Sequence, residues 1–529
     1  MVRFYVLATL IGLGAVTLMA AVIGGPGWWF LLAVVVALVA LGIYDLVQKQ
    51  HSILRNYPVI GHMRFLLEGI RPELQQYFIE RNYDGRPYDR DTRSTIYARA
   101  KGTNEEQPFG TERDVNEIGY EYLVHSTAPR PVATEVPRVR IGGPDCRAPY
   151  EMALLNVSAM SFGALSANAL QALNRGAAKG GFAHDTGEGG ISPYHRQGGD
   201  LVWEIGSGYF GTRTKDGDFD PDQFRDKVAD DQIKLISLKL SQGAKPGLGG
   251  VLPGAKVTAE IAAARGVPQG EKCVSPPYHK AFSTPRELIL FIARMRELAD
   301  GKPTGFKLCV GSRTDVLAIC KAMVAEGITP DFIVVDGAEG GTGAAPQEYE
   351  DHIGTPLTEG LLTVHNALVG AGLRDRVKVG ASGKVATGVD IVKRILQGAD
   401  YTNAARAMMM ATGCIQAQTC HTNTCPVGVA TQDPRRMRAL DVADKTDRVA
   451  NYQRETVQQA MQVIASMGLD SPHQLEPRML RRRIDHTRTE SYAELFDHLA
   501  PGQLLGSAHD LPEDWARDWV QADPDVFKP

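Results

Sequence analysis

Two uncharged apolar runs near the N-terminus constrain the fold of this chain most. Tyr5–Ile23 and Trp28–Tyr44 contain no charged residue. As helices rising 1.5 Å per residue, each run is long enough to cross a hydrocarbon core of about 30 Å. Between them lies the tight turn Gly24–Gly27, and Trp28 and Tyr44 stand where interfacial aromatic residues are common. The sequence therefore predicts a transmembrane helical hairpin in residues 1–50.

A signal peptide and a pair of buried core helices fit these runs less well. A secretory signal peptide also combines a basic residue such as Arg3 with an apolar run, but a second run directly afterwards argues against cleavage. Two buried core helices are disfavoured because both runs are apolar all round. Basic residues flank the hairpin at Arg3, Lys49 and Arg55, and the turn has none. Both ends should therefore face the cytoplasm, which predicts a multi-pass protein of the cell inner membrane.

Composition excludes several classes of protein. A chain of 529 residues is too long for one ordinary domain and can bury a large core. Its net charge of −4 includes no basic run that could follow a phosphate backbone, so no nucleic-acid partner is expected. The densest basic run, Arg481–Arg483, is best interpreted as a solvated helix face. Seven cysteines form no disulfide framework and indicate a reducing compartment.

The middle of the chain alternates short apolar runs with longer amphipathic ones. This pattern is typical of a parallel sheet, and the number of strands is near that of a TIM (β/α)8 barrel. A doubly wound open sheet is the alternative, although no GxGxxG sequence opens a first βα turn. The expected domains are a wrapping segment at 51–148, the barrel at 149–436 and a helical C-terminal region at 437–529. The candidate strands are Ala153–Val157, Lys234–Lys239, Gly305–Val310, Phe332–Asp336, Val377–Gly380 and Tyr401–Ala405, and the candidate helices include Pro285–Leu298, Ser312–Glu326 and Thr446–Met467.

Three cysteines, Cys414, Cys420 and Cys425, lie close together in the sequence near the end of the predicted barrel. Clustered thiolates bind soft metals and iron–sulfur clusters, and Cys425 is followed by proline as in many such sites. Three ligands rather than four suit a 3Fe–4S cluster. The alternative is three unreactive, partly buried thiols, and the spacing alone does not decide between the two.

The residues around these cysteines resemble a known family. CHTNTCPVGVATQ is similar, almost letter for letter, to the cluster-binding segment of glutamate synthases, and six upstream segments follow the order of that family's flavin domain. The resemblance covers roughly residues 149–436, and it continues weakly beyond. The six segments are MSFGALS at 160–166, HDTGEGG at 184–190, LSQGAKPGLGGVLPG at 240–254, VSPPYH at 274–279, DGAEGGTGAAP at 336–346 and TGVDIVKRILQGAD at 387–400.

This resemblance implies a TIM barrel that binds FMN, with the 3Fe–4S cluster held by Cys414, Cys420 and Cys425. In the family the segment that starts at Met160 lies against the flavin ring, and Lys307 matches a lysine near the flavin's pyrimidine edge. Barrel topology adds the loops after the seventh and eighth strands, where glycine-exposed N–H groups can hold phosphate. A single glycine cluster could instead be an ordinary turn. The residues assigned to FMN are Met160, Ser161, Phe162, Gly163, Lys307, Gly340, Gly341, Gly343, Ser382, Gly383, Lys384, Ala404 and Ala405.

The resemblance also implies a substrate and a reaction. Lys245 and Arg265 match family positions that hold 2-oxoglutarate, with Gln242 and Glu188 nearby in the same pattern. The implied enzyme is an oxidoreductase acting on CH–NH2 donors, which reduces the imine of 2-oxoglutarate and ammonia to L-glutamate. A ferredoxin or an electron-donor subunit would supply electrons through the cluster.

Two departures from the family pattern leave other functions open. Leu248 and Val251 stand where the family has Glu and Gln, which puts the exact oxo acid in doubt. The family's glutaminase half carries an N-terminal nucleophilic cysteine, whereas no cysteine precedes Cys146 here. One alternative is a related amine or oxo-acid oxidoreductase that works with separate subunits, among them an amidotransferase. The other is a non-catalytic electron-transfer subunit of the membrane.

Overall fold

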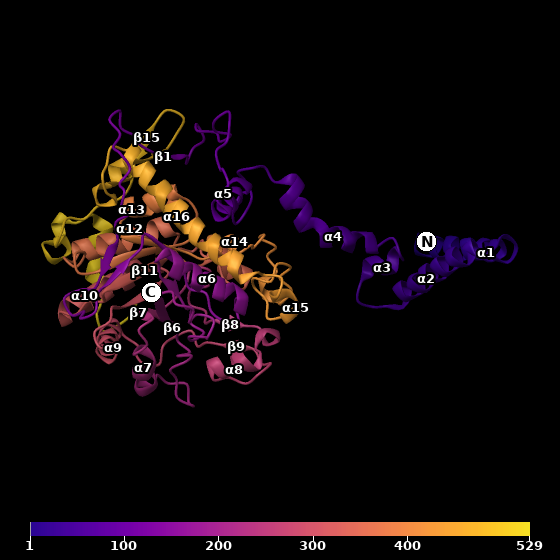
Figure 1. Ribbon diagram of the computed structural model, residues 1–529, viewed down its shortest axis with the longest axis horizontal. Coiled ribbons are helices and arrows are strands. Elements are labelled where there is room, and N and C mark those ends of the chain that lie inside the picture. The colour runs from indigo at the N-terminus through magenta and orange to yellow at the C-terminus, as the bar shows by residue number, and fades with distance from the viewer. Residues whose placement is uncertain (1, 529) are drawn as a thin grey trace. The chain divides into compact units, whose positions relative to one another are not determined.

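The structure is a computed structural model that describes residues 2–528, in two compact units, Met1–Arg90 and Asp91–Pro529. In the first unit, α1 (Val2–Gly24) and α2 (Gly27–Val47) pack against each other as the predicted helical hairpin (Figure 1). Both helices are long and apolar enough to cross a membrane, by length and composition. Three further helical segments complete the unit: α3 (Ser52–Asn56), α4 (His62–Leu74) and the π-helix η1 (Gln75–Ile79).

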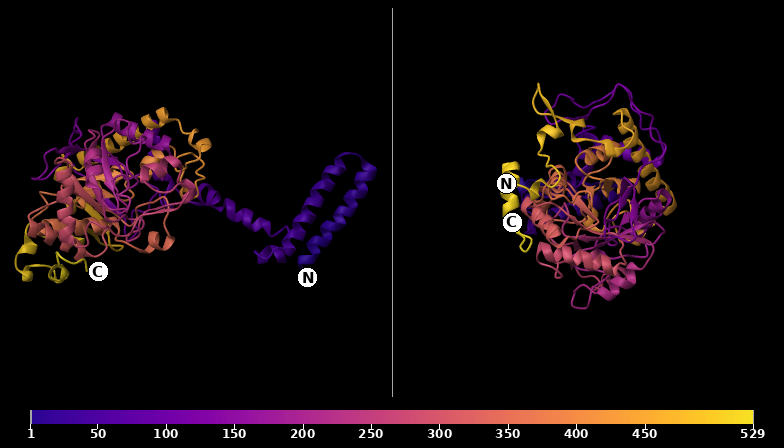
Figure 2. Two further views of the ribbon diagram at one scale, coloured as in Figure 1. Left: turned by 90° about the horizontal axis from the view of Figure 1, so that it is seen from below. Right: turned by 90° about the vertical axis from the view of Figure 1, so that its left-hand side faces the viewer.

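The second unit is built around a closed barrel of eight parallel strands, with helices on its outside (Figures 1 and 2). The last strand pairs with the first, with Thr402 opposite Leu155, so the sheet has no open edge. This closure confirms the predicted TIM barrel and excludes the doubly wound open sheet. The strands in chain order are β4 (Leu155–Val157), β5 (His184–Asp185), β6 (Leu201–Ile205), β7 (Ile233–Lys239), β10 (Thr304–Leu308), β11 (Phe332–Asp336), β12 (Lys378–Ser382) and β13 (Tyr401–Ala404).

Sequence patterning identified six of these eight strands. The two that it missed are β5 and β6, which pair with each other and with their neighbours β4 and β7. Strand β5 has only two residues, too few to show any periodic signal. Strand β6 is buried along its whole length, and such a run cannot be told from a buried helix by periodicity.

Local signals explain why the barrel helices begin where they do. Thr284 caps α9 by accepting a hydrogen bond from the Glu287 N–H, and Ser312 caps α10 in the same way through Thr314. The apolar faces of these helices bury Ile289, Met295 and Leu317 against the outside of the barrel. The helices of this layer are α6 (Ala167–Gly180), α7 (Pro221–Val228), α8 (Ala259–Arg265), α9 (Pro285–Leu298), α10 (Arg313–Glu326), α11 (Gln347–His352), α12 (Leu357–Gly370), α13 (Gly388–Leu396) and α14 (Arg406–Ala411).

Segments that precede and follow the barrel along the chain complete the second unit. The long helix α16 (Val442–Ser466) packs along α6, and α5 (Arg90–Lys101) reaches it through Arg99, which bonds to Thr456. A small antiparallel sheet joins the segment before the barrel to the C-terminal region. The remaining elements are β1 (Glu121–Leu123), β2 (Val139–Ile141), β3 (Tyr150–Met152), β8 (Val251–Leu252), β9 (Cys273–Val274), α15 (Pro434–Met437), β14 (Leu480–Arg483), β15 (Thr489–Ser491), α17 (Tyr492–Leu495) and α18 (Glu513–Gln521).

That small sheet corrects one expectation. Arg481–Arg483 belongs to β14, which pairs with β1 and β15, and is not a helix face. Arg482 forms an ion pair with Glu121 at 3.2 Å, so the arginines are held by cross-strand partners. The helical C-terminal region is confirmed by α16. The first compact unit extends to Arg90.

Candidate active site

The residues predicted to form the site come together at one end of the barrel. Most of them lie at or just after the carboxyl ends of the strands, the end at which TIM barrels carry out chemistry. Met160–Gly163 follows β4, Glu188 follows β5, and Gln242 and Lys245 follow β7. Gly340–Gly343 follows β11, and Lys307 is the penultimate residue of β10. Ser382, Gly383 and Lys384 lie at the end of β12, Ala404 and Ala405 at the end of β13, and Arg265 ends α8 in the insertion between β7 and β10.

A chain of polar contacts joins three of these loops. Lys239, the last residue of β7, forms an ion pair with Glu188 at 2.8 Å. The same ammonium donates to the Gln242 Oε1 at 3.1 Å, and the Gln242 amide donates to the Thr342 hydroxyl at 3.2 Å. The loops after β5, β7 and β11 are therefore held in one arrangement.

Two further cations approach the same carboxylate. The Lys245 ammonium donates to the Ala344 carbonyl at 2.9 Å, and its side chain is buried. Arg265 donates to the Ser161 hydroxyl at 3.3 Å and the Phe162 carbonyl at 3.2 Å, and its guanidinium lies over the Phe210 ring. Its Nε is buried without a hydrogen-bond partner among the described residues. Arg265 thus retains a donor that a bound anion could use.

The electrostatics of this group favour an anionic ligand. Burial alone would raise the pKa of Glu188, but Lys239, Arg265 and Lys245 outweigh it and lower that pKa. Burial lowers the pKa of Lys245 to about 8, helped by the neighbouring Lys239 and opposed by Glu188 and Glu350. Three basic side chains therefore surround one carboxylate. We refer to Glu188, Lys239, Lys245 and Arg265 as the cation cluster.

The Glu188 carboxylate packs directly against the backbone at Gly250, and this contact requires a glycine. A Cβ at Gly250 would overlap the Glu188 carboxylate, so any other residue there would displace it. The same loop carries the two departures from the family pattern. The Leu248 N–H donates a hydrogen bond to the Lys245 carbonyl at 3.3 Å. Val251 of β8 pairs with Val274 of β9.

Lys307 lies inside the barrel among acidic residues. It forms a buried ion pair with Glu204 of β6, in which both side chains are almost fully enclosed. Burial opposes the charge of Lys307, but Glu204, Asp185 and Asp336 outweigh it and raise its pKa. Burial and Glu204 in turn raise the pKa of Asp185 to about 8. This lysine is therefore a fixed cation near the ends of β5, β6 and β10.

The glycine-rich turns leave backbone exposed at the same end of the barrel. Gly383 has φ +142°, a conformation that favours glycine, and Ser382 places its hydroxyl 3.3 Å from that of Ser158. A Cβ at Gly343 would meet no atom within 4 Å, so space remains beside the loop after β11. Gly341 packs closely on Arg406, which donates to the Glu339 carbonyl.

The three cysteines lie on one loop after α14. Cys414 and Cys420 are half-buried and Cys425 is buried, and the short 3-10 helix Cys420–Thr422 lies between the last two. Burial raises the pKa of Cys414 to about 12, with Cys420 and Cys425 adding to the effect, so the three thiols are neighbours. No group of three His, Cys, Asp or Glu in the described residues could hold a single metal ion. A cluster of several irons takes thiolates that lie further apart than the ligands of one ion.

Beneath this loop lies a lysine that the sequence motifs did not indicate. The Lys256 ammonium donates to the Ala164 carbonyl at 2.8 Å and to the carbonyls of Cys420 and Ala430, each at 3.2 Å. Burial lowers its pKa to about 8, against the opposing effect of Cys420 and Cys425. Lys256 thus ties the cysteine loop to the segment that follows Met160–Gly163.

The family follows from comparison with known proteins. Residues 139–470 match the family described as the conserved region in glutamate synthase. The chain belongs to the glutamate synthase family. It is 38% identical over 472 residues to the glutamate synthase large subunit-like protein YerD of Bacillus subtilis, an alignment that covers 81% of this chain and 89% of that protein.

Other glutamate synthases share a shorter region. The archaeal-type glutamate synthase [NADPH] of Thermotoga neapolitana is 34% identical over 321 residues, which cover 59% of each chain. Among solved structures, a flavocytochrome b2 with sulfite bound covers 83% of this chain at 13% identity. That match covers 88% of the flavocytochrome and has a TM-score of 0.41.

Two site residues of this glutamate synthase family member were not predicted from the sequence. Lys239 is hidden in the apolar run IKLISLKL, although a lysine at the carboxyl end of a barrel strand is a recognisable signal. Lys256 follows the LPG turn and looks like a surface residue in sequence. Only the fold places its ammonium against the cysteine loop.

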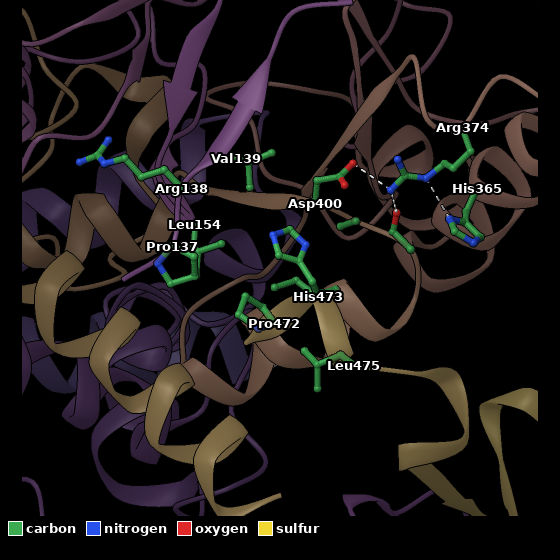
Figure 3. Close-up of a pocket in the computed structure, with 13 residues that line it drawn as sticks. Pro137, Arg138, Val139, Leu154, His365, Arg374, Asp400, Pro472, His473 and Leu475 are labelled. Atoms are coloured by element: carbon green, nitrogen blue, oxygen red, sulfur yellow. Dashed lines mark hydrogen bonds and ion pairs between the residues drawn. The ribbon is translucent and has the colours of Figure 1, made fainter. Parts of the chain in front are cut away.

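A further cavity lies at the other end of the barrel, and Figure 3 shows the residues that line it. Its volume is about 240 Å3, and its lining includes Leu154, His365, Arg374 and Asp400. The Arg374 guanidinium donates to Asp400 at 2.8 Å, to the Val377 carbonyl at 3.0 Å and to His365 at 3.2 Å. These donors are already used within the protein, and TIM barrels carry their active sites at the opposite end, so this cavity is not the candidate active site.

Proposed function

We propose that this protein is an FMN- and iron–sulfur-dependent oxidoreductase that reduces the imine of 2-oxoglutarate and ammonia to L-glutamate. The cation cluster carries the proposal, because three basic side chains converge on one carboxylate at the end of the barrel where substrates bind. Membership of the glutamate synthase family supports the same reaction. The substrate would bring two carboxylates to this excess of positive charge.

The residues at this end of the barrel fit a phosphate-bearing flavin. Space remains beside Gly343, where a Cβ would meet no atom within 4 Å, Gly383 adopts a φ of +142°, and Ser382 adds a hydroxyl. Met160–Gly163 would lie along the ring system, and Lys307, which is paired with Glu204, would lie near the edge of the ring system. Bound there, reduced FMN would supply a hydride to the imine carbon. The cysteine loop fits an iron–sulfur cluster in its donor set, because it carries three thiols and is tied to the barrel unit by Lys256, which donates to the Cys420 carbonyl.

The chain's own groups would bind and orient the substrate. Arg265 can pair with a carboxylate through the Nε that has no partner among the described residues, and Lys245 can act as a point charge. With a pKa of about 8, Lys245 also holds a proton at Nζ that it can release near neutral pH. Glu188 stays ionised beside Lys239 and orients the cations.

The nitrogen and electrons would come from partners. A ferredoxin or an electron-donor subunit would reduce the protein through the cluster, and ammonia would come from solution or from a separate amidotransferase subunit. A related oxo acid is the second candidate substrate, because Leu248 and Val251 replace two polar residues beside Lys245. A protein whose flavin no oxo acid reoxidises would instead be an electron-transfer subunit.

One experiment tests the reaction directly. The absorption spectrum of detergent-purified protein should show flavin and iron–sulfur bands. After anaerobic reduction, 2-oxoglutarate with ammonia should reoxidise the flavin and yield L-glutamate. Reoxidation by a different oxo acid alone would favour the second candidate substrate, and none by any oxo acid would favour the electron-transfer subunit.

The same site predicts a pH dependence. Because burial lowers the pKa of Lys245 to about 8, its ammonium is charged below that pH and neutral above it. The apparent affinity for 2-oxoglutarate should therefore fall as the pH rises through 8. Lys239, Glu188 and Glu350 also face this group, and they shift its titration in opposite directions. Flavin reoxidation at several substrate concentrations and pH values measures the effect. Lys245→Arg should move the fall to higher pH, since arginine stays charged.

We further propose that α1 and α2 anchor the protein in the inner membrane, with the barrel in the cytoplasm. Removing residues 2–90 should give a chain that stays in the supernatant after ultracentrifugation and keeps its flavin. The reason is that the second compact unit contains the whole barrel, its core and the cysteine loop. The full-length chain, extracted only by detergent, is the control. A shortened chain that still sediments with membranes would contradict the anchor.

A further inference from the structure

A stripe of large apolar side chains runs along α4 and η1 without a partner among the described residues of the first compact unit. Its members recur three or four residues apart, the spacing of one helix face. They are all exposed, from 38% at Leu74 to 59% at Leu66, and no residue of α4 is buried. The members of this stripe, which we call the α4 stripe, are Met63, Leu66, Leu67, Ile70, Leu74 and Tyr77.

The face of the same helix beside this stripe is polar. It carries Arg64, Glu68, Arg71 and Gln75, of which Arg64 and Glu68 form an ion pair at 2.9 Å. A helix with one apolar and one charged face buries the apolar face against something. The basic residues Arg64 and Arg71 lie at the border of the polar face, where long side chains can reach anionic groups while their stems cover apolar surface.

The beginning of α4 is fixed to the end of α2. Asp45, in the last turn of α2, is fully buried and accepts a hydrogen bond from the Val59 N–H at 2.8 Å. Its other oxygen lies 2.9 Å from Nε2 of His62, the first residue of α4. Figure 2 (left) shows α4 leaving the hairpin crosswise to both of its helices. The α4 stripe therefore starts at the point where the second apolar helix ends.

We infer that α4 lies flat in the lipid–water interface, with the α4 stripe in the acyl boundary and Arg64 and Arg71 at the headgroups. The inference rests on the membrane anchoring proposed above, because the end of a spanning helix lies at the membrane surface. Amphipathic helices with apolar and basic faces bind this layer, and anionic lipids strengthen the binding. The contacts of Asp45 with Val59 and His62 would hold the helix at that depth.

Site-specific photo-crosslinking tests the inference in the full-length protein. The photoreactive residue p-benzoylphenylalanine would replace Leu67 or Ile70 in the α4 stripe. Matched controls would carry it at the polar positions Glu68 and Gln75. Each protein would be reconstituted in vesicles of phosphatidylethanolamine and phosphatidylglycerol, floated on a density gradient and irradiated. Mass spectrometry then identifies what is attached to the α4 peptide, and circular dichroism checks that each variant is folded.

Lipid adducts at Leu67 and Ile70, several-fold above those at Glu68 and Gln75, are the expected result. Adducts with protein at the stripe positions, whether with the barrel unit or with a second copy of the chain, would overturn the inference. So would equal lipid labelling of both faces. If the full-length chain does not float with the vesicles, membrane anchoring itself is wrong. Flotation without lipid adducts rejects only the interfacial placement of α4.

Discussion

Changing Cys414, Cys420 or Cys425 to serine, one at a time, should abolish the iron and sulfide content of the protein while leaving FMN bound. Each thiol would hold a separate iron, so the loss of any one removes a ligand that its neighbours cannot replace. The flavin should survive because its proposed residues lie at the ends of the barrel strands, outside the cysteine loop. Iron and sulfide assays, with the absorption spectrum of anaerobically purified protein, measure both effects.

Cys146→Ser is the matched control for these variants. Cys146 is also free and partly exposed, but it precedes the barrel and lies outside the cysteine loop. It should retain the full iron content. Wild-type protein purified without oxygen that contains flavin but no iron would reject the cluster. Loss of iron in only one or two of the three variants would reject the set of three ligands.

The fold was largely predictable because a barrel repeats one signal. Strands β10, β11 and β12 alternate with the helices α9, α10 and α12, and this alternation is the sequence signal of parallel βα units. Helix α9 matches its predicted bounds because Pro285 begins it and its cap is local. Strands β5 and β6 were not predictable in this way. They are defined by pairing with β4 and β7, a non-local property that a short run does not encode.

The sequence motifs predicted which loop residues belong to the candidate site, but not which side chains contact one another there. The family resemblance named Glu188, Lys245 and Arg265, and the barrel brings them to one end. It did not reveal that Lys239 is the residue that joins Glu188 to Gln242. Charge balance depends on which side chains face one another across loops far apart in sequence. Lys256 shows the same limit, because its three carbonyl partners come from three separate segments.

These contacts give the cation cluster a net positive charge that a dicarboxylate can neutralise. Lys239 is already paired with Glu188, whereas Arg265 has a free Nε among the described residues. Lys245 donates only to a carbonyl, which does not neutralise its charge. In the proposed reaction, Arg265 and Lys245 would therefore be the two cations available to the substrate. Of the two, Arg265 is better suited to recognise a second carboxylate, because a guanidinium can form two parallel hydrogen bonds with it.

Arg265→Ala and Lys245→Ala should each weaken the binding of 2-oxoglutarate far more than the binding of FMN. Removing one charge-assisted contact typically costs about 1.5–3 kcal/mol, or roughly 10- to 150-fold in apparent affinity. Pyruvate with ammonia is the comparison substrate, because it lacks the distal carboxylate. Reoxidation of the reduced protein by each acid, measured over a range of concentrations, gives the two affinities, and flavin content reports FMN binding. An equal loss for both acids in Arg265→Ala would show that Arg265 does not bind the distal carboxylate. The role would then pass to Lys245, whose alanine variant should lose affinity for 2-oxoglutarate alone.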